Sequence, residues 1–246
     1  MRPFLRATRR TLRNVVHWPG HRRRCPVCGS FVRAFKPYGL VLRPEARCPS
    51  CGALERHRLV WLYLRYCTPF FDRTPRLMLH VAPERALEPG LTEVPNLRRI
   101  TGDLTQRGVM LRFDVTGIPL PDDCFDVIYC SHVLEHVPDD HAAMRELHRV
   151  LKPGGFALLQ VPVLREQTFE DPSVTSPEER LRLFGQHDHV RVYGRDYPER
   201  LAQAGFIVRV EDFAALLPPP MRTYYGLMPG ELVYRGEKAG RPAGRP

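Results

Sequence analysis

The chain has 246 residues, of which 43% are hydrophobic and 26% are charged, a composition typical of a soluble globular protein. Its length allows one large domain, or one domain with a small module. No uninterrupted apolar run reaches the ~18 residues of a membrane-spanning helix, so none is expected. The formal net charge of +10 is concentrated at the start of the chain. Eleven basic residues precede the first acidic residue, Glu45, whereas the remainder carries 26 basic and 27 acidic residues.

Residues 1–24 form a basic arm with the pattern of an amphipathic helix. Apolar side chains such as Leu5 and Leu12 fall on one helical face and most arginines fall on the other, as in helices that lie on membrane surfaces. Three interpretations remain open. The arm either packs on the rest of the protein or frays, or it contacts an anionic membrane surface, or it contacts nucleic acid.

Four of the seven cysteines form a tight pattern, Cys25-Pro-Val-Cys28 and Cys48-Pro-Ser-Cys51, and a glycine follows each pair. Zinc prefers four soft ligands at the corners of a tetrahedron, and each CxxC turn places two thiolates on one side of the ion. Residues 25–52 are therefore predicted to form a zinc ribbon with a closed, structural site. The ribbon strands are expected at 31–35 and 40–42, with the turn at 37–39.

The other three cysteines are scattered, and we interpret them as buried small apolar side chains. Reduced cysteines favour a reducing compartment, and a cytoplasmic location is expected. Residues 53–75 follow the ribbon and have the apolar spacing of a connecting helix. The charged run Glu55–Arg58 on that helix is either a salt-bridged structural face or a surface that touches a substrate.

From residue 76 onward, strand patterns alternate with helix patterns, which predicts an α/β domain with a largely parallel sheet. Lys152-Pro153-Gly154-Gly155 carries the proline and glycine that commonly follow a helix. The three prolines at 218–220 predict a rigid connection. The predicted strands are 76–82, 97–103, 109–114, 125–130, 156–161, 205–210 and 231–234, and the predicted helices are 140–151 and 197–204.

Ligands of such sheets bind at the carboxyl ends of the strands. These ends carry Ala82-Pro83-Glu84, Asp103, Asp114 and Ser131-His132. Asp103 follows Glu84 by nineteen residues, close to the ~20 that separate a first turn from a ribose-binding carboxylate.

Two blocks carry a resemblance to a known family. Residues 113–138 read FDVTGIPLPDDCFDVIYCSHVLEHVP and residues 145–155 read RELHRVLKPGG. Together with Asp103 they resemble class I S-adenosylmethionine-dependent methyltransferases of the methyltransferase domain 11 group. The resemblance is strong over 76–162 and weak over 195–235. It implies a Rossmann-like, doubly wound and mostly parallel seven-stranded sheet.

The resemblance also implies roles for single residues. Asp103, followed by Leu104, would bind the ribose hydroxyls of S-adenosylmethionine. Asp114 would accept from the adenine amino group, and Val115 would lie beside the ring. Ser131 and His132 would border the methionine part.

The first motif departs from the family pattern of an acid followed by a glycine-rich turn. His80 replaces the acid, and Ala82, Pro83 and Glu84 replace the turn. Ala82 nearly preserves the close backbone approach that glycine allows. We hypothesise that Glu84 anchors the ammonium group of the cofactor; the alternative is a degenerate loop and an empty site.

Residues 162–194 form an insertion after the fifth strand, and in proteins similar to this one that segment commonly covers the active site. An oxygen or nitrogen acceptor needs a base to take its proton, and His187, Asp188 and His189 are the candidates. Two alternatives are a metal site made by the two histidines with nearby acids, and a salt-bridged lid ordered by Arg191.

The predicted organisation is an arm (1–24), a zinc ribbon (25–52), a connecting helix (53–75), a methyltransferase domain (76–235) with its lid insertion, and a disordered tail (236–246). The predicted function is methyl transfer to a small molecule or a glycan. The alternatives are a non-catalytic zinc-ribbon protein that binds nucleic acid on a vestigial methyltransferase fold, and an RNA methyltransferase.

Overall fold

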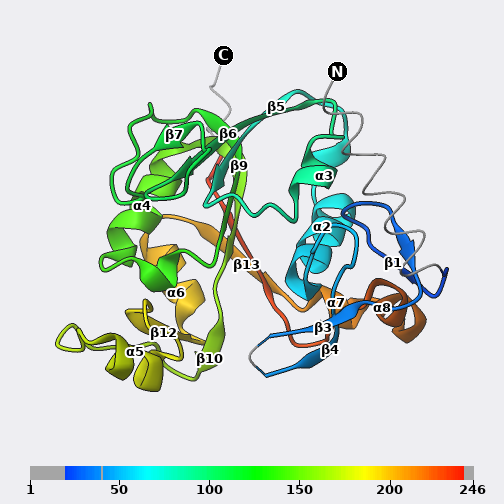
Figure 1. The fold of residues 1–246 in the computed structure, drawn as a ribbon. Helices are drawn as coiled ribbons and strands as arrows, with labels where there is room; N and C mark the ends of the chain where they lie inside the picture. The colour runs from blue at the N-terminus through cyan, green and yellow to red at the C-terminus, as the bar shows by residue number, and fades with distance from the viewer. Residues whose placement is uncertain (1–19, 40, 241–246) are drawn as a thin grey trace, which may run out of the picture. The chain divides into compact units, whose positions relative to one another are not determined.

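The computed structural model describes residues 20–39 and 41–240, which fall into two compact units (Figure 1). The first, which we call the cysteine unit, comprises the described residues up to Thr74 together with Glu84–Asn96 and Asp212–Leu232. The second, the sheet unit, comprises Pro75–Pro83, Leu97–Glu211 and the described residues from Val233 onward. The predicted arm lies almost wholly outside the described residues. Within the described ranges, no helix has the length and apolarity needed to cross a bilayer.

A seven-stranded sheet forms the sheet unit, in the order β13-β14-β9-β8-β5-β6-β7. All neighbouring pairs are parallel except those that involve β14, which is antiparallel to both β13 and β9. This confirms the predicted α/β class and the mostly parallel seven-stranded sheet. The strands are β5 (Arg76–Val81), β6 (Leu97–Asp103), β7 (Leu111–Arg112), β8 (Phe125–Ser131), β9 (Leu151–Gln160), β13 (Ile207–Glu211) and β14 (Val233–Glu237).

The strand order reverses at β5: the chain first moves outward through β6 and β7, and then returns to β8 on the other side. Such a reversal opens a crevice at the carboxyl ends of the strands. Almost every residue of β8 is buried, as expected for a central parallel strand covered on both faces. Helices α4 (Asp140–Val150) and α6 (Tyr197–Gln203) contact one another beside this sheet (Figure 1).

The strand predictions hold for all seven strands, with shifts at several ends. The third strand is shorter than predicted. The fifth begins at Leu151, directly after α4, because the LKPGG block forms an irregular start of β9 in which Gly154 has φ +79°. The last strand runs to Glu237, and Lys238 still exchanges backbone hydrogen bonds with Gly154 and Gly155. Gly236 and Glu237, predicted as tail, therefore belong to a strand that lies between β13 and β9, and Lys238 continues its backbone hydrogen bonds to β9.

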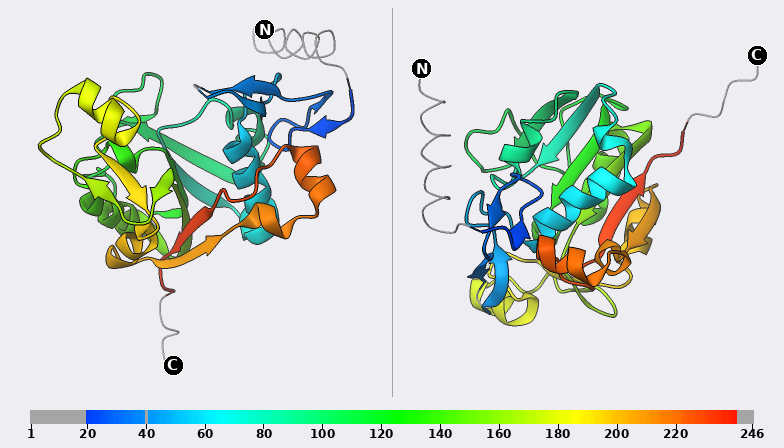
Figure 2. Two further views of the ribbon diagram at one scale, coloured as in Figure 1. Left: turned by 90° about the horizontal axis from the view of Figure 1, so that it is seen from below. Right: turned by 90° about the vertical axis from the view of Figure 1, so that its right-hand side faces the viewer.

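The insertion after β9 folds on a small core of its own (yellow in Figure 2). Its three short strands form a separate sheet in the order β10-β12-β11. Phe184, at the end of α5, packs with Val174 and Val192. The elements are β10 (Val163–Arg165), β11 (Phe169–Glu170), α5 (Pro177–Phe184) and β12 (Arg191–Gly194).

Two short hairpins and five helical segments make up the cysteine unit. Trp61, Tyr63 and Phe70 form part of its core, and Tyr63 meets Phe213 edge to face at 5.7 Å. Gly90 is required at its position, because a Cβ there would lie 2.5 Å from the Trp61 ring. The elements are β1 (Arg23–Arg24), β2 (Phe31–Val32), β3 (Lys36–Tyr38), β4 (Arg43–Arg47), α2 (Glu55–Cys67), η1 (Pro69–Phe71), α3 (Glu88–Leu91), α7 (Phe213–Leu216) and α8 (Pro219–Tyr225).

Two local predictions in this unit differ from the structure. The long ribbon hairpin pairs β3 with β4, so its turn falls after Tyr38 and not at 37–39, and β2 pairs with β1 instead. The prolines at 218–220, predicted as a rigid connection, are divided: Pro218 lies between α7 and α8, whereas Pro219 and Pro220 belong to α8. Pro219 is the first residue of α8. The fixed φ of proline suits this position, and its missing N–H costs nothing there because the first N–H groups of a helix have no acceptor within the helix.

Candidate active site

A cavity of about 500 Å³ opens at the carboxyl ends of β5, β6 and β8 and beyond β7, entirely within the sheet unit. Its size is that of a small-molecule or cofactor pocket. Six of the eight predicted cofactor residues line it, namely Ala82, Asp103, Leu104, Asp114, Val115 and His132. The strand ends thus bring these side chains together. Ser131 and Glu84 are not among the lining residues.

Asp103 and Asp114 are held in the same way. Oδ1 of Asp103 accepts from the backbone N–H groups of Thr105 (2.7 Å) and Gln106 (2.6 Å). Oδ1 of Asp114 accepts from the N–H and the hydroxyl of Thr116, at 2.9 and 2.8 Å. Such local bonds fix a carboxylate in a turn. In the described part of the chain Oδ2 of each aspartate has no hydrogen-bond partner, so each presents one oriented acceptor.

The backbone around the cavity is unusual at two positions. Ala82 and His132 both have positive φ, +48° and +54°, a region that glycine occupies readily and other residues rarely. Ala82 therefore adopts a conformation that glycine would occupy without strain. Strained residues of this kind cluster at functional sites. Gly102, next to Asp103, leaves the space that the ring of Phe113 fills, since a Cβ there would lie 2.0 Å from that ring.

Glu84 lies in the cysteine unit and not in the cavity wall. Its Oε1 lies 2.8 Å from the Arg56 guanidinium and 2.6 Å from Nε2 of His57. Burial alone would raise the pKa of Glu84, but the hydrogen bond from His57 and the charge of Arg56 outweigh it, and this pKa lies well below its usual range. The carboxylate is thus ionised and already paired on α2. Its predicted contact with the cofactor ammonium stays a prediction.

The three candidate bases occupy one turn after α5 but differ in their surroundings. His187 is exposed, and Asp188 lines the cavity with Oδ2 3.3 Å from Nδ1 of His136. His189 is buried, and its Nδ1 lies 3.3 Å from the carbonyl oxygen of Phe184. Burial lowers the pKa of His189, so the neutral ring is favoured. The role of these three residues as bases stays a prediction.

Arg191 ties the insertion to the loop after β8. It is 2% exposed and donates to the carbonyl oxygens of Leu134 and Pro138, each at 2.8 Å, and to that of Val137. It also donates to Glu170 at 2.8 Å. The buried guanidinium thus holds the insertion and this loop together, and the role of the insertion as a lid stays a prediction.

Sequence reasoning missed Glu135 and His136. Both lie on the 3₁₀-helix η2 (Leu134–His136), and His136 lines the cavity. Oε1 of Glu135 lies 3.0 Å from Nδ1 of His132. The signal was present, since these residues belong to the block that carried the family resemblance, directly beyond the end of β8.

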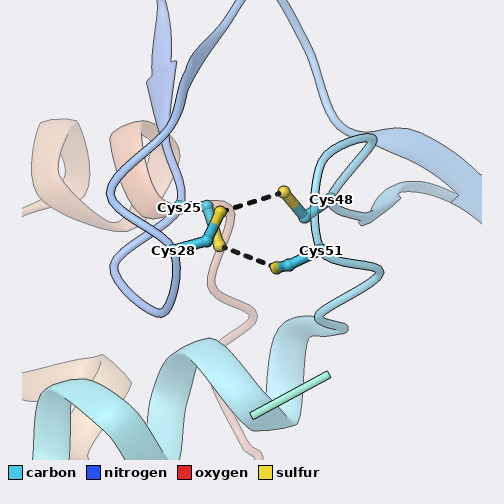
Figure 3. A group of neighbouring side chains, drawn as sticks. All are labelled: Cys25, Cys28, Cys48 and Cys51. Carbon is cyan, nitrogen blue, oxygen red and sulfur yellow. Dashed lines mark hydrogen bonds between the residues drawn. The ribbon is translucent and has the colours of Figure 1, made fainter. Parts of the chain in front are cut away.

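Figure 3 shows the four ribbon cysteines facing one another across one small space. The Sγ atoms of Cys25 and Cys51 are 3.7 Å apart, and those of Cys28 and Cys48 are 3.9 Å apart. Four thiolates around a tetrahedral zinc ion, with bonds of about 2.3 Å, lie about 3.8 Å from one another. Disulfide sulfurs would lie about 2.05 Å apart. The cluster therefore fits a zinc ion, as predicted for a zinc ribbon.

The cavity lies at the reversal point of a mostly parallel sheet, which is where α/β domains of this architecture bind their ligands. Residues 87–159 match the methyltransferase domain family. This match agrees with the resemblance of the sequence to S-adenosylmethionine-dependent methyltransferases.

Curated relatives match over short stretches. The chain is 44% identical over 59 residues to the ubiquinone/menaquinone biosynthesis C-methyltransferase UbiE of Xanthomonas campestris, which covers 22% of this chain and 23% of that protein. It is 30% identical over 119 residues to the 27-O-demethylrifamycin SV methyltransferase of Amycolatopsis mediterranei, covering 46% and 40%. The chain thus spans less than half the length of these relatives.

Solved structures are similar at lower identity. A methyltransferase from Archaeoglobus fulgidus shares 16% of its residues over 73% of this chain and 93% of that one, with a TM-score of 0.48.

Proposed function

We propose that this chain transfers a methyl group from S-adenosylmethionine to an oxygen or nitrogen atom of a small molecule or glycan. One observation carries the proposal: Asp103 and Asp114 line the same cavity, each with one carboxylate oxygen fixed by its own turn. Preorganised acceptors of this kind suit the hydroxyl and amino donors of a nucleoside. The family membership of residues 87–159 supports the choice of ligand.

The residues present fit the cofactor. Asp103 would accept from the ribose hydroxyls and Asp114 from the adenine amino group, with Leu104 and Val115 as apolar neighbours of the nucleoside. Ser131 and His132 would lie beside the methionine part. The Ser131 hydroxyl is buried without a hydrogen-bond partner among the described residues, which is uncommon in a folded protein unless a ligand or water completes it. When bound, the cofactor supplies an electrophilic methyl group.

Holding the acceptor close and correctly oriented is the main requirement for methyl transfer. Asp188 and His136 are the ionisable groups of the insertion and of η2 that reach the cavity. We propose that they face the acceptor and that a residue of the 187–189 turn receives its proton. The names of the relatives include a C-methyltransferase and a methyltransferase of an O-demethylated small molecule; the oxygen acceptor proposed here follows the second.

We also propose that the cysteine cluster holds zinc in the cell. All four ligand positions are protein thiols, so the ion has no open position for chemistry and would stabilise the cysteine unit. A bound zinc ion requires the reduced thiols of a reducing compartment, consistent with the expected cytoplasmic location.

Calorimetry with S-adenosylhomocysteine tests cofactor binding. The wild type should bind, and Asp103→Ala should bind at least about tenfold more weakly, because it loses charge-assisted hydrogen bonds of about 1.5–3 kcal/mol. Purified protein is then incubated with S-adenosylmethionine and separate panels of hydroxylated small molecules, amines, glycans and RNA, and S-adenosylhomocysteine formation is measured. Absence of binding by the wild type contradicts the proposal, and turnover with RNA alone favours the RNA methyltransferase alternative.

A further inference from the structure

Three metal-ligating side chains meet at the edge of the cavity, away from the cysteine cluster. One potential ligand atom from each of Glu135, His136 and His189 lies within 4.8 Å of the others. The two imidazole rings are 4.7 Å apart between centroids and nearly perpendicular, at 82°. Ligands of a tetrahedral ion with bonds of about 2.0–2.1 Å lie about 3.4 Å apart. A small inward movement of these side chains would therefore place all three on one ion.

Both histidines are oriented by hydrogen bonds from the ring nitrogen Nδ1. In His189 this atom lies 3.3 Å from the carbonyl oxygen of Phe184. In His136 it lies 3.3 Å from both the carbonyl and a carboxylate oxygen of Asp188. A ring that donates through Nδ1 keeps the lone pair of Nε2 for a metal ion. Metal-ligating histidines in proteins usually have such a second partner.

Glu135 supplies the second, independent observation. The residue is 1% exposed, and its Oε2 is buried with no hydrogen-bond partner among the described residues, while Oε1 is occupied by His132. A buried carboxylate oxygen without a donor or cation is costly and rare. A cation at this point would satisfy it.

The backbone holds the two contributing segments together. The N–H of Val190, next to His189, donates to the carbonyl of Glu135 at 2.9 Å. Arg191, one residue further, donates to the carbonyl of Leu134. Ligands held on ordered segments need little rearrangement to bind an ion.

We propose that Glu135, His136 and His189 bind a divalent transition-metal ion beside the methyl-acceptor end of the cavity. Two imidazoles with one carboxylate suit zinc or iron(II) and leave at least one coordination position open. Magnesium and calcium prefer all-oxygen sets and fit less well. Since His136 lines the cavity, the open position would take the oxygen of a hydroxyl-bearing acceptor.

This inference rests on the proposed function only for the identity of that acceptor. His189 then acts as a ligand and not as the predicted base. The sequence suggested, as an alternative, a metal site made by His187 and His189 with nearby acids. The site proposed here shares only His189 with it, and Glu135 and His136 take the place of the exposed His187.

Cobalt(II) uptake tests the site without any activity measurement. The full-length protein, with zinc already in its cysteine cluster, is dialysed against cobalt(II), and bound zinc and cobalt are measured by mass spectrometry. Visible absorption identifies the coordination, because cobalt in the cysteine cluster would show thiolate charge-transfer bands that a nitrogen and oxygen site lacks. We expect one cobalt per chain beyond the zinc, without those bands.

Variants assign the ion to its ligands. His189→Asn and Glu135→Gln should each weaken cobalt binding at least tenfold, whereas the control His187→Asn should leave it unchanged. If circular dichroism shows that His189→Asn does not fold, two other variants are used instead. Glu135→Gln keeps the side-chain size, and His136→Asn changes a half-exposed position. A wild type that takes up no second ion overturns the proposal, and so does an equal loss in His187→Asn.

Calorimetry with S-adenosylhomocysteine on the same samples separates the two proposals. Cobalt uptake without cofactor binding leaves the metal site standing and contradicts the methyltransferase function. Cofactor binding without cobalt uptake leaves the methyltransferase function standing and contradicts the metal site.

Discussion

Nε2 of His57 lies 2.6 Å from Oε1 of Glu84, and the tautomer of the ring follows from its other side. Nδ1 of His57 accepts from the backbone N–H of Leu54 at 2.9 Å, so Nε2 carries the proton and donates to the carboxylate. The His57 ring thus accepts a hydrogen bond from the backbone at the start of α2 and donates one to Glu84, the last residue of the first-motif turn. Because this contact joins two segments of the cysteine unit, Glu84 has a structural role whether or not it also meets a ligand.

The pH dependence of stability tests the Glu84 contact. The folded pKa of Glu84 is lowered from 4.5, so the stabilisation it gives is present above the unfolded value and is lost as the pH falls through the folded one. Glu84→Gln should reduce the free energy of unfolding at neutral pH, and the difference from the wild type should shrink below about pH 4.5. Urea denaturation across this range measures it. Glu166→Gln removes a carboxylate from an exposed pair and should change little at any pH.

The anchoring hypothesis for Glu84 is tested separately by calorimetry with S-adenosylhomocysteine. If Glu84 binds the ammonium group, Glu84→Ala should lower the affinity about tenfold or more, the loss expected for a charge-assisted hydrogen bond. Equal affinities of Glu84→Ala and the wild type would sink the hypothesis and leave the contact with α2 as its role.

Asp114 and Asp171 form a matched pair for testing the cofactor site. Oδ1 of Asp171 accepts from the N–H and hydroxyl of Ser173 at 2.9 and 2.7 Å, the same turn that Asp114 makes with Thr116, but Asp171 does not line the cavity. Asp114→Ala should weaken S-adenosylhomocysteine binding about tenfold or more, and Asp171→Ala should not. Similar losses of affinity in both variants would contradict the assignment of Asp114 to the cofactor site, because Asp171 shares its turn but not its place in the cavity.

Arg58 links several segments of the cysteine unit through hydrogen bonds to backbone carbonyls. It is 0% exposed and lies 3.9 Å from the centre of the Phe35 ring. Each buried carbonyl left without a donor costs about 1–3 kcal/mol, so Arg58→Met should lower stability by at least about 3 kcal/mol. It donates to the carbonyl oxygens of Glu45, Ala46, Ala53, Tyr225 and Gly226.

Thermal unfolding followed by circular dichroism measures this loss. Arg65→Met on the same helix is the control, because Arg65 is exposed and only stacks on Phe71. A melting temperature of Arg58→Met as high as that of Arg65→Met would contradict the assigned role.

Replacing one cysteine of the cluster tests the proposed zinc ion, which this change should release. Cys48→Ser leaves three thiolates, and a structural zinc site of this size provides much of the folding free energy of its module. We expect a zinc content well below one per chain and a lower melting temperature. Cys124→Ser, outside the cluster, should keep both. Full zinc content in Cys48→Ser would show that the cysteines do not hold the ion together.

The residues at the strand ends were predictable because an apolar strand pattern and the acid that follows it are adjacent in the sequence. The bounds predicted for β6 agree with the structure, and the acids placed at its end and beyond β7 line one cavity. The partners of His189 were not predictable, since they come from a segment more than fifty residues earlier that only tertiary folding brings near. The start of α8 was missed because three successive prolines suit a helix start as well as an extended connection.

The chain passes between the two units five times, after residues 74, 83, 96, 211 and 232. Neither unit is therefore a contiguous fragment that could be cut out and expressed alone. A truncation before residue 212 would remove α7 and α8 from the cysteine unit, along with two of the carbonyls that Arg58 binds, and β14 from the sheet. Mutational dissection of this protein therefore has to proceed by point substitution within the intact chain, because the segments of the cysteine unit and of the sheet unit alternate along the sequence.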